Sequence, residues 1–270
     1  MRENGFILRN IRGVPYYSCR EFELLPRLSH GFSTRHGGVS GPSLNLSDAR
    51  WDSPDRVQEN RHRFLSALNL EEAHLTTLRQ IHSNRVHIIE DISGRWNQSV
   101  GDALITRVEN VALAVQIADC VPILIADPVN NAVAAVHSGW RGTLNRILLK
   151  TIREMQVTFD SDPARLLLAV GPGIRACCFE VGLEVAGSFE EQYPGCSLAK
   201  PMQGRPDKRS LDLFKALKIQ MKLAGVPSEN CHDLGACTCC NTGEFFSHRA
   251  EGPAAGRMMA VIGLLPKKFR

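Results

Sequence analysis

The sequence predicts an α/β fold in which β-sheets are covered by helices. Short, almost continuous apolar runs gather in the middle of the chain, and Gly or Pro residues separate them. Other segments carry apolar residues at helical spacing. Continuous apolar runs are typical of strands buried on both faces, so this mixture indicates sheets flanked by helices. The 270 residues, 43% of them hydrophobic, are compatible with one large domain.

The clearest strand candidate is residues 111–118, whose sequence VALAVQIA is apolar at all but one position. Further runs of the same kind lie at 121–126, 132–136, 166–170 and 258–264. Each run is short enough for a strand and is bounded by turn-forming residues. We therefore expect these runs to form the central strands of the fold.

Helices are expected at residues 54–68, 143–155 and 211–223. The first begins with Ser53 and Pro54, which are typical of the N-cap and of the first helical position. The second carries one apolar stripe, made of Leu144, Ile147, Leu148, Ile152 and Met155. The third ends at residues 225–227 (GVP). Residues 187–210 are rich in Gly, Pro and charge, and are expected to form a long surface excursion.

The composition disfavours several classes of protein. No stretch of 18 apolar residues is present, and residues 1–10 lack the apolar core of a signal peptide. A cytoplasmic protein without membrane contact is therefore expected. The nine cysteines are then expected to be free thiols, ligands or nucleophiles. A net charge of +4 and 6% aromatic residues do not indicate a nucleic-acid-binding surface.

His82, Cys120 and His137 are the candidate metal ligands. Taken singly, a buried free cysteine and two hydrogen-bonded histidines are the ordinary interpretation. However, Asp119 is a polar residue in an apolar stretch, and His137 ends a predicted strand just before a polar segment. Ligand sites in α/β folds lie at strand ends. Two imidazoles and a thiolate suit zinc and leave a fourth position for water or substrate.

A second cysteine group lies near the C-terminus and consists of Cys231, Cys237, Cys239 and Cys240. Its spacing contains one Cys-x-x-Cys pair, whereas a zinc ribbon needs two. Cys177 and Cys178 add ligands only if the fold brings them close. Buried or redox-active thiols are the simpler interpretation of this group, and a structural metal is the alternative.

Two segments offer groups for an anion. Residues 141–143 (RGT) are expected to begin a helix, whose N-terminal N–H groups favour phosphate. Residues 33–38 (STRHGG) supply hydroxyls, a guanidinium and adaptable backbone, although a plain hairpin turn is the favoured explanation of the paired glycines taken by themselves.

Seven motifs, spread in order along the chain, carry a resemblance to a known family. They are residues 30–40 (HGFSTRHGGVS), 80–83 (QIHS), 101–103 (GDA), 119–122 (DCVP), 137–142 (HSGWRG), 170–174 (VGPGI) and 246–249 (FSHR). With these motifs the chain resembles the laccase-domain family, whose members are named variously as multicopper polyphenol oxidase, purine nucleoside phosphorylase and peptidoglycan editing factor. The resemblance covers roughly residues 30–264. It implies a single-domain layered sandwich of mixed β-sheets, spanning residues 1–270.

The resemblance also implies roles for individual residues. It places the metal on His82, Cys120 and His137. It makes the following residues candidates for substrate binding: Arg35, Asn45, Arg141 and Arg249. Glu180, in the matching segment 177–182 (CCFEVG), is the candidate for proton transfer. His248 departs from the family pattern, which has an aromatic residue at this position.

The names within the family imply different reactions, and the ligand set distinguishes them. A multicopper oxidase needs about ten histidines in His-x-His pairs, whereas this chain has nine histidines and no such pair. We therefore expect a zinc-dependent purine nucleoside enzyme, with copper as an opportunistic occupant. The resemblance implies phosphorolysis of adenosine, inosine and 5′-methylthioadenosine, and deamination of adenosine. Nucleoside and phosphate are the expected small-molecule partners.

Two alternatives use the same residues. In the first, the protein is a cysteine hydrolase or amidase acting on cell-wall precursors, with Cys120 as nucleophile and His137 or His82 as its base. In the second, it is a copper-dependent, laccase-like polyphenol oxidase. A binding module without catalysis is least favoured, because it has no need of a metal with an open coordination position.

Overall fold

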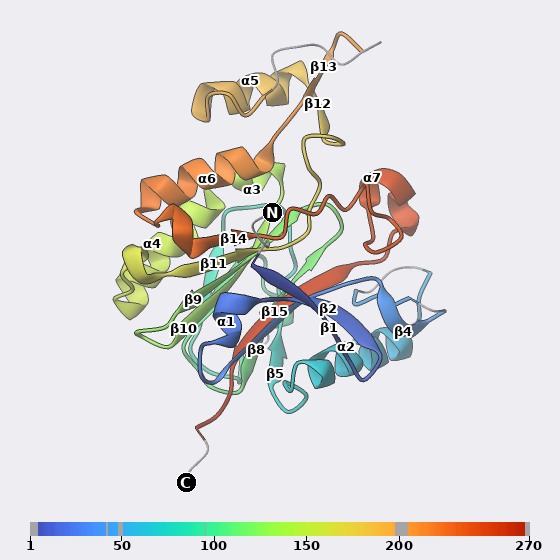
Figure 1. Ribbon diagram of the computed structural model, residues 1–270, viewed down its shortest axis with the longest axis vertical. Helices are drawn as coiled ribbons and strands as arrows, with labels where there is room; N and C mark the ends of the chain where they lie inside the picture. The colour runs from blue at the N-terminus through green and yellow to red at the C-terminus, as the bar shows by residue number, and fades with distance from the viewer. Residues whose placement is uncertain (1–4, 42, 48–50, 95, 198–204, 268–270) are drawn as a thin grey trace.

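Two six-stranded β-sheets lie face to face, and helices cover their outer surfaces (Figure 1). The computed structural model describes residues 5–41, 43–47, 51–94, 96–197 and 205–267. The predicted layered α/β sandwich is therefore confirmed.

The first sheet joins the two ends of the described chain. In spatial order it contains β1 (Phe6–Ile11), β2 (Val14–Cys19), β3 (Leu28–Ser33), β15 (Met258–Leu264), β8 (Val111–Ile117) and β5 (His74–Thr76). All neighbours are antiparallel except β5, which is parallel to β8. The short β4 (His36–Ser40) lies beside this sheet and packs on α2.

The second sheet carries the candidate site. Its order is β14 (Cys231–Asp233), β11 (Leu167–Val170), β9 (Val121–Asp127), β10 (Ala132–Ser138), β7 (Ala103–Thr106) and β6 (Val86–Ile89). The outermost pairs at both edges are parallel and the inner pairs are antiparallel, so this sheet is also mixed. A separate ribbon of β12 (Glu180–Gly182) and β13 (Lys208–Ser210) projects from the sandwich together with α5 (Figure 1).

The helices differ widely in length. The α-helices are α1 (Arg20–Glu23), α2 (Pro54–Ala67), α3 (Trp140–Leu144), α4 (Ile147–Phe159), α5 (Leu183–Gln192), α6 (Leu213–Ala224) and α7 (His248–Glu251). Short 3₁₀ turns are η1 (Trp96–Gln98), η2 (Pro163–Arg165), η3 (Ser228–Asn230) and η4 (Gly252–Ala254). None of the helices within the described residues is long and apolar enough to cross a membrane.

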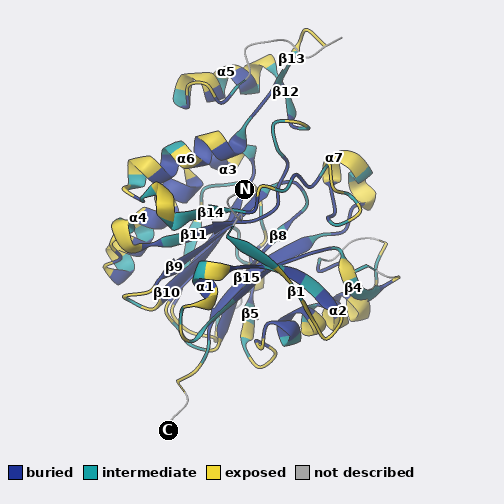
Figure 2. Cartoon of the chain, in the orientation of Figure 1, coloured by how far each residue is buried: buried dark blue, intermediate teal, exposed yellow. Residues whose placement is uncertain are grey.

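The cores follow the alternation of side chains along the strands. Ile123 and Ile125 of β9 join the core under α4 and α6, whereas Leu124 between them belongs to the core shared by the two sheets. The first sheet alternates in the same way, and its outer face packs against α2 through Ala112 and Val261. The central strands of both sheets are therefore buried on both faces (Figure 2), as the continuous apolar runs predict.

All five predicted strands and the helices at 54–68 and 211–223 are confirmed to within two residues. The expected helix at 143–155 is instead two helices, α3 and α4, because Arg146 adopts a left-handed conformation with φ 60°. The carbonyl of Thr143 accepts hydrogen bonds from Gln220 and Tyr193, at 2.8 and 3.0 Å, and so is held outside a continuous helix.

The expected surface excursion at residues 187–210 is only partly irregular. Its first part belongs to α5, whose Ala186 and Phe189 are buried at helical spacing, and its end forms β13. Residues 198–204 of this segment lie outside the described residues.

Candidate metal centre and cavity

Cys120 and His137 come together because β9 and β10 are antiparallel neighbours. Cys120 immediately precedes β9, and His137 lies near the end of β10, opposite Pro122. The side chain of His137 is almost completely buried, whereas Cys120 is half-buried. The strand pairing therefore fixes two candidate ligands at the same end of two central strands of the second sheet.

The third ligand, His82, comes from the connection between β5 and β6, where its backbone has φ 62°. Asp102, which precedes β7 and is completely buried, holds this connection. Its Oδ1 accepts a hydrogen bond from the backbone N–H of His82 at 2.9 Å, and its Oδ2 accepts from the N–H and hydroxyl of Ser83, both at 2.6 Å.

Asp102 also orients His137. Its Oδ1 lies 2.9 Å from Nδ1 of His137, which leaves Nε2 of that ring for a ligand role. Burial by itself would raise the pKa of Asp102, but the hydrogen bonds from His137 and Ser83 outweigh it and lower the pKa to about 2. A permanently ionised carboxylate therefore supports two of the three candidate ligands.

The electrostatics favour the ligand forms of Cys120 and His137. Burial would raise the pKa of the Cys120 thiol, but the charges and hydrogen bonds of His137 and His82 outweigh it and lower the pKa to about 6. Burial by itself would lower the pKa of His137, but the Cys120 thiolate and Asp102 outweigh it and raise the pKa to about 9. A thiolate–imidazolium pair results at neutral pH, and a cation that replaces the proton finds a thiolate and an imidazole.

The three side chains fit a metal ion. One ligand atom from each of His82, Cys120 and His137 lies within 4.8 Å of the others. Gly139 makes this approach possible, because a Cβ at that position would be 2.6 Å from Cδ2 of His82 and 3.0 Å from Sγ of Cys120. Two imidazoles and one thiolate are a zinc ligand set with one position left open.

The triad opens into a cavity of about 880 Å³. Its lining comes from the segment before α2, α2 itself, the connection before β6, η1, the ends of β8 and β10, α3, the segment after β11, α7 and the residue before β15. The lining residues are Ser47, Arg61, Thr77, Leu78, Arg79, Gln80, His82, Asn97, Gln116, Ala118, Asp119, Cys120, His137, Trp140, Arg141, Ile174, Phe179, His248, Arg249 and Arg257. Five of these are arginines and one is a carboxylate, so the cavity favours an anionic ligand.

The carboxylate, Asp119, is used to build the wall. Its Oδ1 accepts hydrogen bonds from the hydroxyls of Thr238 and Ser247, both at 2.7 Å, and its Oδ2 accepts from the backbone N–H of Arg249 at 2.6 Å. The residue has φ 89°, a left-handed conformation that is uncommon outside glycine. Asp119 thus connects the ligand Cys120 to α7.

Two of the predicted substrate-binding residues, Arg141 and Arg249, line the cavity. The guanidinium of Arg141 stacks on Trp140, 4.4 Å from the ring centroid. That of Arg249 donates to the carbonyls of Cys178 and Glu180, at 3.2 and 3.1 Å. The helix after His137 begins at Trp140 and has only five residues, so the arginines are the main source of positive charge here.

Three other predicted site residues lie outside the cavity lining. Arg35 pairs with Glu251 of α7 at 2.8 Å and stacks on Phe246. The amide of Asn45 is completely buried and binds backbone groups, including the N–H of Arg257 at 3.0 Å. The carboxylate of Glu180 pairs with Arg205. These contacts give Arg35 and Asn45 a place in supporting the cavity wall.

Sequence reasoning assigned no role to several residues of the site. Asp102 was visible only as the centre of the 101–103 motif. The remaining arginines of the cavity come from segments far apart in the chain and share no local pattern; they are Arg61, Arg79 and Arg257.

The fold and the site define a layered α/β protein with a candidate three-ligand metal centre beside a cationic cavity. The chain belongs to the family described as multi-copper polyphenol oxidoreductase laccase, whose family model matches residues 29–265. No metal-binding group among the described residues offers more than two histidines, which does not fit a cluster of several coppers.

The chain is similar to proteins that are named as purine nucleoside enzymes. It is 40% identical to a purine nucleoside phosphorylase of Deinococcus radiodurans, over 87% of this chain and 88% of the relative. It is 35% identical to the adenosine deaminase RL5 from an unknown prokaryotic organism, over 86% and 92%. The crystal structure of YlmD from Geobacillus stearothermophilus superposes with a TM-score of 0.85 at 30% identity, covering 97% of this chain and all of that one.

Proposed function

We propose that this protein is a zinc-dependent purine nucleoside enzyme. It cleaves adenosine, inosine and 5′-methylthioadenosine with phosphate and deaminates adenosine. The observation that carries the proposal is the joining of the His82–Cys120–His137 triad to a cavity lined by five arginines. The volume of about 880 Å³ is ample for a nucleoside and a phosphate ion. The names of the similar proteins supply the substrate class.

In this proposal the chain provides binding, orientation and charge. Arg141 and Arg249 stand beside the triad and attract phosphate, while Trp140 and Phe179 offer aromatic faces to the purine. Asp102 keeps Nε2 of His137 directed toward the metal position. When bound by the triad, zinc supplies Lewis-acid polarisation of substrate or water. Glu180, which pairs with Arg205 outside the cavity lining, is left out of the proposed reaction.

The test uses the purified protein, adenosine and phosphate. We expect adenine, ribose 1-phosphate and inosine to form, together with hypoxanthine from phosphorolysis of that inosine, as separated by chromatography. Cys120→Ala should lose about one zinc ion per chain and both activities, because two imidazoles alone hold zinc weakly. A matched control is Cys196→Ala, a buried cysteine outside the cavity. If Cys120→Ala keeps its full zinc content and its activity, the proposal is wrong.

A second candidate function rests on the arrangement of three side chains, those of Asp102, His137 and Cys120. A carboxylate that orients a histidine beside a low-pKa thiol is also the arrangement of a cysteine nucleophile and its base. Such a nucleophile is free in the resting enzyme, so iodoacetamide should inactivate the native protein rapidly. Zinc ligation predicts the opposite result, with Cys120 protected until a chelator is added.

A further inference from the structure

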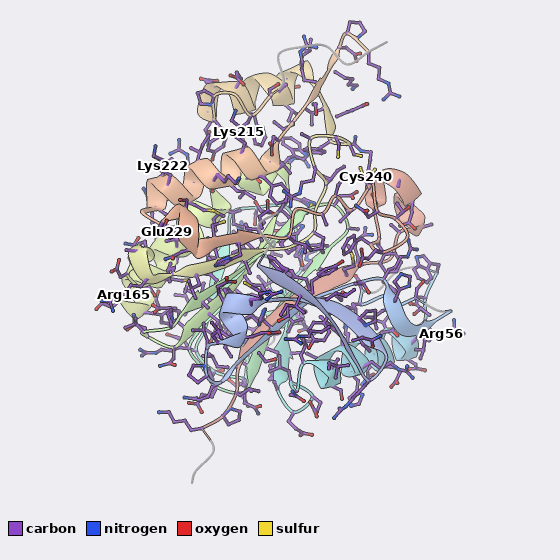
Figure 3. The ribbon with its side chains drawn as sticks, in the orientation of Figure 1. Arg56, Arg165, Lys215, Lys222, Glu229 and Cys240 are labelled. Carbon is purple, nitrogen blue, oxygen red and sulfur yellow. The ribbon has the colours of Figure 1, made fainter. Side chains whose placement is uncertain are left out.

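Four cysteines from two distant segments meet next to residues of the cavity wall, where the carbonyl of Cys178 accepts a hydrogen bond from Arg249. Cys177 and Cys178 follow β11, whereas Cys237 and Cys240 follow β14. Their four sulfur atoms all lie within 4.8 Å of one another. Cys240 lies near α7, where Figure 3 labels it. Cys177 and Cys178 therefore supply the second pair of cysteines that the Cys-x-x-Cys segment at Cys237 and Cys240 lacks by itself.

Backbone hydrogen bonds join the two segments independently of any metal. The N–H of Gly173 donates to the carbonyl of Ala236 at 3.3 Å, and that of Thr238 donates to the carbonyl of Gly173 at 3.2 Å. Gly173 and Cys237 form a parallel bridge. The cysteines consequently stand on a prepared frame, as a rigid metal site requires.

The sulfur geometry fits a shared cation better than disulfides. Sγ of Cys240 lies 3.4 Å from Sγ of Cys177 and 3.3 Å from that of Cys178. A disulfide needs about 2.05 Å, whereas four thiolates about 2.3 Å from one zinc ion stand about 3.8 Å apart. One cysteine adjoining two others at nearly equal distances also has no single partner for a disulfide.

The sulfur of Cys237 accepts a hydrogen bond from the backbone N–H of Arg175 at 3.4 Å. A backbone donor of this kind is compatible with a thiolate ligand. The cluster is partly exposed, since Cys177 and Cys240 are at the surface, so an ion can reach it.

We propose that Cys177, Cys178, Cys237 and Cys240 form a second metal site, in which four thiolates hold one structural zinc ion. Four cysteine ligands and no open position are characteristic of structural zinc. The ion joins the segment that carries Ile174 and Phe179 of the cavity wall to the segment that carries Thr238, a hydrogen-bond partner of Asp119. The second ion thus fixes the cavity wall without taking part in the reaction.

Zinc content of variants tests the proposal. We expect about two zinc ions per chain in the wild type and about one in Cys237→Ser/Cys240→Ser. Cys239→Ser is the matched control, because Cys239 lies in the same turn but is not one of the four ligands, and it should keep about two. Wild-type content in the double variant would overturn the proposal.

A second variant tests the four-cysteine site without changing any of its cysteines, so that misfolding of the first variant cannot explain the result. His82→Ala/Cys120→Ala removes the triad and leaves the four cysteines unchanged, so it should retain about one ion. Its cobalt derivative should give the strong sulfur-to-cobalt charge-transfer absorption of several thiolates. A folded but metal-free variant would overturn the proposal. So would an intact mass, measured without reductant, that is lower by two hydrogens for each bond between these cysteines.

Discussion

At the residue scale, Asp102 holds both the backbone and the side chains of the candidate metal centre in place. One carboxylate accepts hydrogen bonds from the His82 backbone, from Ser83 and from the ring of His137. The charge is buried, and a buried charge is tolerated only where it is well paired. Asp102 therefore stabilises a connection in which His82 adopts φ 62° and also orients the ring of His137.

Asp102→Asn should weaken zinc binding at the triad without unfolding the protein. The amide preserves the shape but loses the charge, and it cannot accept all the hydrogen bonds that the carboxylate accepts. Loss of such an outer partner typically reduces metal affinity by about 10- to 100-fold. The measurement is competition with a zinc chelator, followed through loss of activity. Asp91→Asn changes an exposed carboxylate and serves as the control; equal affinities for both variants would contradict the role of Asp102.

Arg141→Ala should impair phosphorolysis more than deamination. Arg141 lines the cavity beside the triad, and deamination of adenosine needs no phosphate. A charge-assisted contact is worth about 1.5–3 kcal/mol, or roughly ten- to hundredfold in the phosphate-dependent rate. The readout is the ratio of the two rates, with Arg153→Ala on the exposed face of α4 as control. A parallel fall of both rates would assign Arg141 to the shared nucleoside pocket or to the fold.

The three candidate ligands could be recognised as candidates in the sequence because each stands in a short polar motif, and two of them, Cys120 and His137, adjoin an apolar run. Arg35 stands in such a motif and Asn45 was a candidate through the family resemblance, yet Arg35 binds Glu251 and Asn45 binds backbone groups of the wall. A motif reports that a side chain has a fixed polar environment; it does not report whether the partner is protein or ligand. Only the three-dimensional positions separate these cases.

At the element scale, strand β3 contains a buried histidine that is neutral in the folded state. His30 accepts a hydrogen bond from the backbone N–H of Cys19 at 2.8 Å through Nε2. Burial lowers the pKa of His30 to about 4. Because this folded-state pKa lies below the ordinary value of about 6.5, the unfolded chain binds a proton first as the pH falls.

Acidification should therefore destabilise the wild type through His30. Its contribution is present above about pH 6.5 and is lost toward pH 4, so the free energy of unfolding should fall by about 2 kcal/mol between pH 7 and 5. His30→Gln keeps an acceptor but no titrating ring and should flatten this part of the profile. Urea denaturation at several pH values measures it, and His62→Gln on the exposed face of α2 is the control. Identical slopes for His30→Gln and wild type would contradict the assignment.

Helix boundaries can depend on contacts with distant residues, which hydrophobic periodicity in the sequence does not show. The apolar stripe of residues 143–155 does face the core, but the break at Arg146 depends on Gln220 and Tyr193 binding the carbonyl of Thr143. Both partners lie far away in the sequence. In contrast, the bounds of α2 follow from local signals, since Ser53 caps the helix by accepting from the N–H of Arg56.

At the scale of the whole molecule, the sandwich was predictable because a strand buried on both faces has a recognisable composition. The strand order was not, because β15 lies between β3 and β8, from distant parts of the chain. The pairing of distant segments also explains why the cavity arginines share no local pattern. They come from segments that only the assembled sheets and helices bring together.

Leu124→Ala should destabilise the whole sandwich in one step. Leu124 is completely buried in the core between the two sheets, at the centre of β9. Truncation of such a side chain leaves a cavity and costs about 2–5 kcal/mol. Because each sheet supplies one wall of this core, both sheets should lose structure together. Far-ultraviolet circular dichroism and tryptophan fluorescence should report one lowered urea midpoint, with Leu24→Ala, 82% exposed, unchanged. Separate midpoints for the two probes would contradict unfolding in one step.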